Sequence, residues 1–215
     1  PWLQGDEYDS VMNYPFMESV NNFFINKNLK SIDFMYMMNR CYSLYMENVN
    51  KVLFNFLDSH DVGRVYSRFC NEDVFFQQLV ILITMPGSPC IFYGTEIAME
   101  GSGGPFNRKP MPWKEIKGGE KNYIFNEVKT LIGIRREYSA LKSNCIEWKC
   151  GEDRLIHYVR SGKTDIEVYI NADSNDKSIK LTEQKIIYAR GYSENILSPG
   201  GSLIVRRSRN EDTEC

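Results

Sequence analysis

The spacing of hydrophobic and polar positions changes once along the chain, near residue 144. Before this point, short apolar runs alternate with longer segments in which apolar residues recur at helical spacing. After it, short apolar segments follow one another and turn residues separate them. Alternating strands and helices are typical of a parallel sheet covered by helices, whereas closely spaced short strands are typical of antiparallel β-structure. The pattern therefore predicts an α/β part followed by an all-β part.

The elements of the first part follow from the length and spacing of its apolar runs. In residues 31–48, Ile32, Met35 and Met38 recur at three-residue steps, which indicates a helix. The run KVLFNFL at 51–57 is short and rich in Val and Phe, so it predicts a buried strand. By the same criteria we predict strands at 8–12, 51–57 and 90–93, helices at 16–26, 31–48, 72–85 and 121–137, and a loop at 101–112.

The number of strands limits the architecture of the two parts. Three strand–helix units are too few for a closed eight-stranded barrel, so the first part is either a small open sheet or part of a barrel. In the second part, turn signals such as Ser198-Pro199-Gly200-Gly201 separate the apolar segments, which favours an antiparallel β-sandwich. We predict that the α/β part covers 1–143, the sandwich 144–207 and a polar tail 208–215. The predicted sandwich strands are 146–148, 154–160, 165–172, 178–181, 185–189 and 202–207.

Composition argues against several classes of function. Hydrophobic residues make up 42% and charged residues 25% of the 215-residue chain, which is ordinary for a globular protein. The formal net charge of -2 provides no strong field, so we expect no binding to nucleic acid or to a membrane surface. No apolar run approaches the roughly 18 residues of a membrane span. The six cysteines form no C-x-x-C pair, so we expect thiols in a reducing, cytoplasmic compartment and no zinc site.

The segment NFLDSHD at 55–61 points most directly to chemistry. The predicted apolar strand delivers His60 and Asp61 side by side at its carboxyl end, which is the end where ligands bind in α/β folds. A carboxylate beside an imidazole can hold two neighbouring sugar hydroxyls, one as acceptor and one as donor. Taken alone, the pair favours a structural interpretation, a helix N-cap or a polar loop, and only its context changes this.

That context is a set of motifs in a fixed order along the chain. The segment NFLDSHD is followed by Arg64, and the other motifs are WLQGDEYDSVMNYPF at 2–16, MPGSPCIFYGTEIAMEG at 85–101, NRKPMPW at 107–113 and LIGIRREYSAL at 131–141. Together they resemble glycoside hydrolase family 13, the α-amylase family. They are most similar to its branch of neopullulanases, maltogenic amylases and cyclomaltodextrinases, and the resemblance extends over residues 2–206.

The resemblance implies a fold and a reaction. The first part would supply strands six to eight of a TIM (β/α)8 barrel, and the second part the small antiparallel domain that follows the barrel. The family cleaves or transfers α-glucosidic bonds with retention, using a nucleophile and an acid/base about 5 Å apart. A third carboxylate binds the 2- and 3-hydroxyls of the sugar being cleaved. By its place in the motif, Asp61 is that catalytic, transition-state-stabilising carboxylate, and His60 is its hydroxyl-binding neighbour.

The resemblance also places the other two carboxylates upstream of Pro1. Nothing in residues 1–15 matches their motifs, so we expect the chain alone to be inactive, and its start without Met agrees with a missing N-terminus. Asn13 and Tyr14 either line the sugar site or serve the structure, and Arg108 either binds sugar or braces its loop. Among softer candidates, Trp113 either stacks on sugar or anchors its loop, and His157 is expected to be a packed or surface residue.

The implied partner is an α-glucan, such as maltodextrin, cyclodextrin or pullulan, and no cofactor is implied. Some family members bind calcium through ligands that lie largely upstream, so the sequence predicts no metal site and leaves calcium open. The resembled branch often dimerises through an N-terminal domain that these residues do not contain, which leaves a homo-oligomer open.

Two other interpretations compete with an enzyme of this family. The first is a non-catalytic carbohydrate-binding or scaffold protein with an amylase-like fold, against which the presence of both His60 and Asp61 argues. The second is a complete small α/β protein with its own activity. The unfinished barrel argues against it, because half a barrel leaves open sheet edges.

Overall fold

The computed structural model describes residue 3 and residues 7–208. Three extended segments of the first part run parallel. Strand β1 (Phe54–Asn55) pairs with β2 (Ser88–Pro89), and Met12 forms a parallel bridge with Phe54 on the other side of β1. The order across this small sheet is therefore Met12, β1, β2. The predicted strands at 8–12 and 51–57 exist, but their regular pairing is limited to these few residues.

The strand predicted at 90–93 is wrong by two residues, because Pro89 lies inside the strand and not in a chain break. The backbone N–H groups of Ser88 and Cys90 donate to the carbonyls of Leu53 and Asn55, both at 2.7 Å. Alternate residues of a strand face the same neighbour, so Pro89 lies between the two donors and its missing N–H is not needed on this side. The sequence rule that proline ends a strand therefore fails at an edge position.

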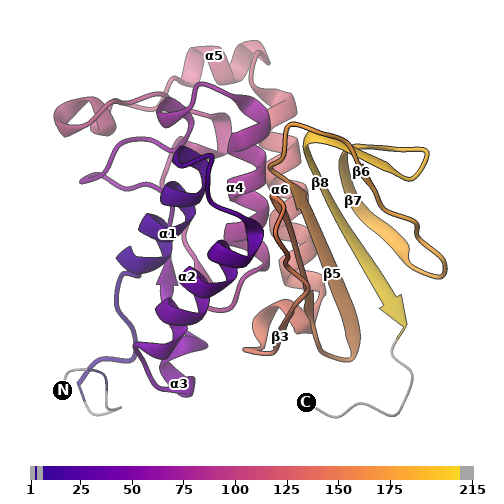
Figure 1. Cartoon of the computed structure of the whole chain (residues 1–215). Coiled ribbons are helices and arrows are strands. Elements are labelled where there is room, and N and C mark those ends of the chain that lie inside the picture. Colours follow the sequence, from indigo (N-terminus) through magenta and orange to yellow (C-terminus); the bar gives the residue numbers. More distant parts are fainter. Residues whose placement is uncertain (1–2, 4–6, 209–215) are drawn as a thin grey trace.

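Helices connect and cover the parallel segments (Figure 1). The predictions for α1 (Tyr14–Ile25), α4 (Glu72–Thr84) and α6 (Asn122–Glu137) are confirmed to within two residues at each end. The single helix predicted at 31–48 is wrong. It divides into α2 (Ser31–Ser43) and α3 (Glu47–Asn50), and the Asn50 side chain donates to the Tyr42 carbonyl at 2.8 Å, which satisfies the end of α2. The loop predicted at 101–112 contains the 3-10 turn η3 (Gly104–Arg108) and leads into α5 (Trp113–Gly118); the other 3-10 turns are η1 (Tyr66–Arg68), η2 (Thr95–Ile97) and η4 (Ser139–Lys142).

The second part is antiparallel throughout, as predicted, but hydrogen bonds join its six strands into one sheet. The strand order is β3-β4-β5-β8-β6, and β7 also pairs with β8, so the predicted sandwich of two sheets is not confirmed. The strands are β3 (Ile146–Trp148), β4 (Leu155–Arg160), β5 (Thr164–Asn171), β6 (Lys177–Ser178), β7 (Lys185–Ser193) and β8 (Ile196–Ser208).

The last hairpin turns earlier than the sequence suggests. Glu194 and Asn195, with φ of 50° and 64°, form a two-residue connection between β7 and β8. Two consecutive left-handed residues are the geometry that suits the twist of a hairpin. The turn predicted at Ser198–Gly201 is therefore wrong: these residues lie within β8, where the left-handed Gly200 accompanies a shift in register against β7.

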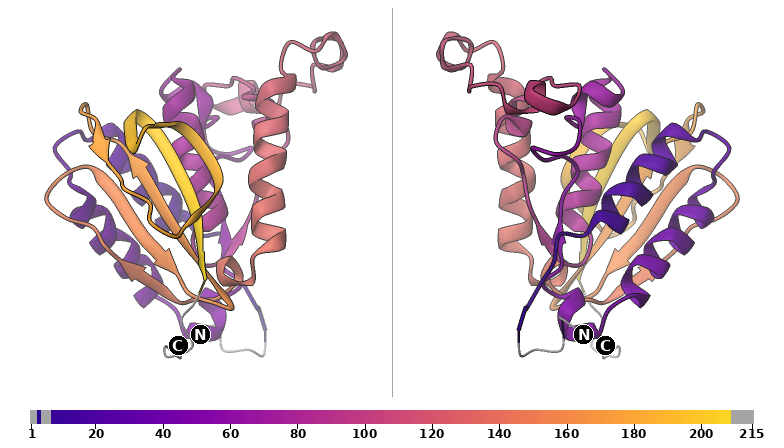
Figure 2. Two further views of the ribbon diagram at one scale, coloured as in Figure 1. Left: turned by 90° about the vertical axis from the view of Figure 1, so that its right-hand side faces the viewer. Right: turned by 90° about the vertical axis from the view of Figure 1, so that its left-hand side faces the viewer.

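Helix α4 joins the two parts, because it is buried on all sides from Phe75 to Thr84. It packs against α6 of the first part and against β8 of the second, and Figure 2 shows it alongside the sheet. One hydrophobic cluster accordingly contains Phe76 of α4 together with Tyr158 and Ile204 of the sheet. The opposite face of the sheet carries a smaller cluster around Leu203 and Val205. Both parts thus share a core, and the boundary predicted at residue 143 stays a prediction.

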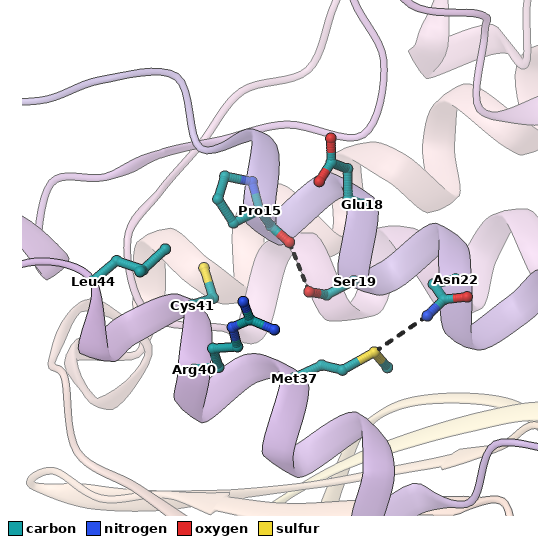
Figure 3. Close-up of a pocket in the computed structure, with 8 residues that line it drawn as sticks. All are labelled: Pro15, Glu18, Ser19, Asn22, Met37, Arg40, Cys41 and Leu44. Atoms are coloured by element: carbon teal, nitrogen blue, oxygen red, sulfur yellow. Dashed lines mark hydrogen bonds between the residues drawn. The ribbon is translucent and has the colours of Figure 1, made fainter.

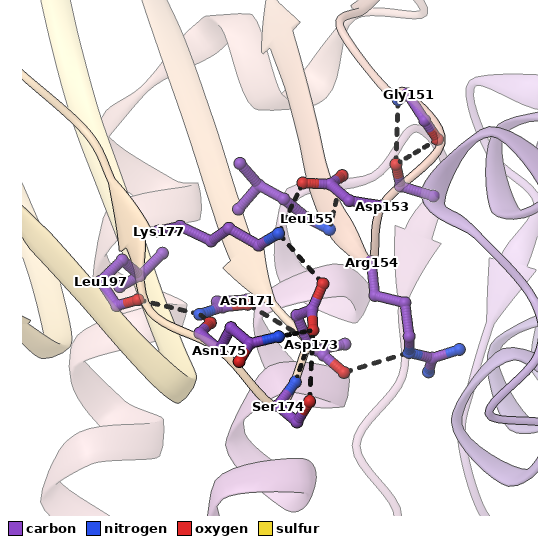
Figure 4. Close-up of polar contacts among 12 residues, drawn as sticks. Gly151, Asp153, Arg154, Leu155, Asn171, Asp173, Ser174, Asn175, Lys177 and Leu197 are labelled. Atoms are coloured by element: carbon purple, nitrogen blue, oxygen red, sulfur yellow. Dashed lines mark hydrogen bonds and ion pairs between the residues drawn. The ribbon is translucent and has the colours of Figure 1, made fainter.

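Polar contacts also join the two parts near the start of β4, where Figure 4 shows Arg154 close to Asp173 and Lys177. The buried guanidinium of Arg154 donates to the carbonyls of Phe23 and Asn26 at 3.0 and 3.2 Å and to that of Ala172 at 3.1 Å. Nearby, the ammonium of Lys177 lies 3.0 Å from the carboxylate of Asp173, and this hydrogen bond lowers the pKa of Asp173 to about 2. The Arg154 contacts hold the carbonyls of Phe23 and Asn26, at the end of α1, against the sheet.

Two further expectations concern cysteines and membranes. Among the described residues, Cys41, Cys70, Cys90 and Cys150 carry free thiols. In the part of the chain that the structure describes, no helix has the length and apolar character needed to cross a membrane.

Arg190 of β7 generates a prediction about stability. Its guanidinium lies 2.7 Å from Glu72 and 3.0 Å from Asp73 of α4, and 3.1 Å from Glu127 of α6. We expect Arg190→Met to lower the free energy of unfolding at pH 7 by about 2 kcal/mol, because three carboxylates lose a shared partner. Urea unfolding would measure the change, and Arg136→Met, at an exposed arginine of α6, is the matched control.

The same variant has a defined pH dependence. Burial raises the pKa of Glu72, but hydrogen bonds from Tyr123 and Arg190 outweigh it and hold this pKa below its ordinary value. Stability from a carboxylate with a lowered native pKa is present above the ordinary glutamate pKa of about 4.3 and is lost as pH falls through the native pKa. The difference between the wild type and Arg190→Met should therefore shrink below about pH 4. An undiminished difference there would contradict the ionic origin of the effect.

Candidate active site

The carboxyl ends of the parallel segments meet at one edge of the small sheet. Tyr14 follows Met12, the residues 58–61 follow β1, and Tyr93 and Gly94 follow β2. Because parallel strands end at the same edge, the residues after each strand are brought together there. The structure thus gathers loops from distant parts of the sequence around Asp61.

Asp61 lies between an imidazole and a guanidinium at this edge. One carboxylate oxygen is 3.2 Å from His60 Nε2, and the other is 3.4 Å from Arg108 Nη2. More than half of each side chain is exposed, 55% for Asp61, 53% for His60 and 60% for Arg108. A carboxylate beside an imidazole and a guanidinium, all open to solvent, can hydrogen-bond neighbouring hydroxyls of a sugar. An ion pair this exposed contributes only about 0–1 kcal/mol, so it does not hold Arg108 in place by itself.

A second carboxylate, Asp58, lies three residues before Asp61 and is buried. It accepts from the backbone N–H of Val65 at 3.0 Å and from the hydroxyl of Thr95 at 2.9 Å. Burial raises the pKa of Asp58, and these two hydrogen bonds counter part of that rise. Asp58 therefore closes the loop that bears Asp61 and ties it to the loop after β2. Sequence reasoning missed this role, although a carboxylate directly after a buried strand was a signal for it.

Arg64 is the second residue that sequence reasoning left without a role. Its side chain is fully buried and donates to the carbonyls of Tyr93 and Asn107, the latter at 2.9 Å. The guanidinium carbon also lies 4.2 Å from the centre of the Phe92 ring and 4.8 Å from that of Tyr93. The guanidinium thus contacts both the loop after β2 and the loop that carries Arg108.

Asn13 and Tyr14 lie in different environments in the structure. Asn13 is fully buried: its side-chain oxygen accepts from the backbone N–H of Phe16 at 3.2 Å, and its amide donates to Asn55 at 2.7 Å. These contacts match the structural alternative, since Asn13 caps α1 and ties it to β1. Tyr14 is 37% exposed, and its ring packs edge-on against Phe56 at 5.0 Å between centres. Of the two, Tyr14 has surface available to a ligand.

The softer candidates lie apart from this contact network. His157 is packed in the sheet, with Nε2 2.8 Å from Glu167 and its ring stacked on Tyr169 at 4.1 Å. Trp113 is exposed at the start of α5. Within residue 3 and residues 7–208, no three His, Cys, Asp or Glu side chains come together in a group that could hold a metal ion.

A groove of about 470 Å³ lies elsewhere, between α1 and α2 (Figure 3). Its walls include Glu18, Arg40 and Cys41, and none of the five predicted site residues lines it. Two of its residues are held by contacts within the helix pair, Ser19 to the Pro15 carbonyl and Asn22 to the Met37 sulfur. The groove follows from the packing of two helices, and the candidate site remains the sheet edge around Asp61.

Comparisons with known proteins bear on this site. The sequence matches the family description "Alpha amylase, catalytic domain" over residues 1–185. It is 37% identical over 187 residues to a cyclomaltodextrinase of Thermoanaerobacter pseudethanolicus, which covers 85% of this chain and 32% of that protein. It is 32% identical over 225 residues to an intracellular maltogenic amylase of Bacillus subtilis, which covers 95% of this chain and 37% of that protein.

Solved structures agree with the sequence matches. The maltogenic amylase from S. marinus superposes with a TM-score of 0.84 at 28% identity, covering 97% of this chain and 30% of that one. The chain therefore spans about a third of the length of the curated relatives it matches. Since the family match extends over most of the sequence, the chain belongs to the α-amylase family, glycoside hydrolase family 13.

Proposed function

We propose that this chain is part of a retaining glycoside hydrolase that cleaves α-glucosidic bonds of maltodextrin, cyclodextrin or pullulan. The observation that carries the proposal is the exposed Asp61 carboxylate, held between His60 and Arg108 where the parallel segments end. The names of the relatives, cyclomaltodextrinase, maltogenic amylase and neopullulanase, support the substrate class.

In this proposal, Asp61 is the third carboxylate and not the nucleophile. It accepts hydrogen bonds from the 2- and 3-hydroxyls of the sugar at the cleaved bond, while His60 donates to the same sugar. Contacts to the 2-hydroxyl that strengthen in the transition state contribute several kcal/mol, which lowers the barrier rather than tightening ground-state binding. Arg108 holds the Asp61 carboxylate from the other side, and Tyr14 offers an aromatic edge to the ligand.

The nucleophile and the acid/base are assigned to residues outside this chain. A retaining enzyme needs those two carboxyl groups about 5 Å apart across the scissile bond. Asp58 is the nearest carboxylate to Asp61 in sequence, but it is buried and engaged by Val65 and Thr95, so it cannot serve in either role. We therefore propose that the chain by itself is inactive.

The proposed fold follows the same assignment. The Met12 segment, β1 and β2 are strands six to eight of the (β/α)8 barrel, and residues 144–207 are the small domain that follows it. The proposed location is the cytoplasm, supported by a relative named as intracellular and by four free thiols. An α-glucan is the proposed partner, and a homo-oligomer stays open.

The first prediction concerns Asp61 in the full-length protein that contains this chain. We expect Asp61→Asn to lower kcat on maltoheptaose by about a thousandfold with a much smaller change in KM, because the lost contacts strengthen in the transition state. Steady-state release of reducing sugar measures both constants. Asp176→Asn, at an exposed aspartate of the second part, is the matched control and should leave both unchanged. Full activity in Asp61→Asn would remove the assignment, and sugar binding without any hydrolysis by the wild type would favour the non-catalytic alternative.

The second prediction concerns the 215-residue chain on its own. We expect it to release no reducing sugar from maltodextrin, because Asp61 alone can neither form a glycosyl-enzyme nor protonate a leaving group. The measurement is a long incubation at high protein concentration, with the full-length protein as the positive control. Hydrolysis that disappears in Asp61→Asn would show that the chain carries a complete reaction centre of its own.

A further inference from the structure

Arg64 is a buried cation held by the protein backbone. Its guanidinium donates to the main-chain carbonyls of Tyr93 and Asn107 and to the Met99 sulfur at 3.7 Å, and its flat face lies against Phe92 and Tyr93. The Nε donor of Arg64 has no partner among the described residues, and losing the remaining contacts of a buried charge would be costly, so these contacts restrain the backbone that supplies the carbonyls. Only a planar guanidinium can point separate donors at two carbonyls and stack on rings at once, and lysine cannot do this.

The two carbonyls belong to the two loops that surround Asp61. Tyr93 follows β2, and Asn107 lies in η3, directly before Arg108. Asn107 adds two contacts, since its amide donates to the Val62 carbonyl at 2.9 Å and its side-chain oxygen accepts from the backbone N–H of Gly103 at 2.8 Å. The loop bearing Arg108 is thus fastened to residues 62–64 from both directions.

Residues 62–64 and the loop that carries Arg108 pack closely against each other. The backbone N–H of Arg64 donates to the Gly101 carbonyl at 3.0 Å. A Cβ placed on Gly101 would lie 2.7 Å from the Phe106 carbonyl oxygen and 2.9 Å from Cγ of Arg64. A glycine at this position is therefore required by the close approach of the two chains.

We propose that Arg64 is a positioning residue that places the Arg108 guanidinium against the Asp61 carboxylate. Arg108 and Asp61 are both exposed and 3.4 Å apart, a contact too weak to order a long side chain. The backbone of residue 108 must therefore be placed by something else, and the Arg64–Asn107 contact lies one residue away. This inference rests on the proposed function.

A double-mutant cycle on the full-length protein tests the proposal, with maltoheptaose as substrate. We expect Arg64→Lys to lower kcat by about tenfold in the wild-type background and by less than about twofold in an Arg108→Ala background. A merely structural role would lower the folded fraction equally in both backgrounds, so the ratio of the two effects separates the alternatives. Thermal unfolding of the wild type, the two single variants and the double variant gives the folded fraction of each protein. The kcat values are then compared per folded protein.

Arg68→Lys is the matched control for Arg64→Lys. Arg68 is a partly buried arginine of the same loop that donates to the carbonyls of Leu57 and Gly63, both at 2.7 Å, and to Asn21, without contacting the Arg108 loop. Its effect should be the same with and without Arg108. Should Arg64→Lys fail to fold, Asn107→Ser releases the same loop from the other side and should show the same dependence on Arg108.

Each outcome has one interpretation. An active wild type in which the effects of Arg64→Lys and Arg108→Ala multiply overturns the positioning role and leaves the proposed function standing. A wild type that hydrolyses no α-glucan overturns the proposed function, and the role of Arg64 falls with it. An effect of Arg64→Lys that depends on Arg108 while that of Arg68→Lys does not supports the proposal.

Discussion

Buried arginines that donate to backbone carbonyls hold this structure together at three places. Arg154 connects the end of α1 to the sheet. Arg160 donates to the carbonyl of Thr84 at the end of α4 and to that of Ser143. Arg64 connects the loops around Asp61. A buried guanidinium left without acceptors costs several kcal/mol, so each one fixes the backbone around it. Main-chain carbonyls, unlike side chains, cannot turn away without moving the chain. The same chemistry therefore joins the two parts and shapes the candidate site.

Sequence reasoning predicted an element correctly where the element depends on interactions within its own segment. Helices α4 and α6 and the strands β4 and β5 were predicted because the length of each apolar segment and the residues that bound it are local to that segment. The errors arose where a distant partner decides. Pro89 is tolerated in β2 because only its neighbours donate to β1, and Asn50 ends α2 from a position outside that helix. The sandwich was not confirmed because β8 is long enough to pair with β5 at one end and with β6 at the other.

The candidate site shows the same division. His60 and Asp61 were predicted because they are adjacent in a motif, and their contact at 3.2 Å is local. Asp58 and Arg64 received no role, because their partners lie far along the chain: Thr95 is 37 residues from Asp58, and Asn107 is 43 residues from Arg64. No periodicity relates such pairs. A family resemblance assigns roles to residues that meet substrate, but it does not reveal which buried contacts place them.

This division reflects a physical requirement of the site. Asp61, His60 and Arg108 must stay exposed to meet a sugar, yet exposed ion pairs contribute too little to order long side chains. The geometry of the site must then be fixed by buried groups, because a buried hydrogen bond is stronger and a buried polar group without a partner is more costly. Arg64 follows Asp61 by only three residues, so one short loop links the exposed carboxylate to the buried frame. Motion of that loop would have to break contacts to Asp58, Tyr93 and Asn107 together, which is why an open surface can hold a defined geometry.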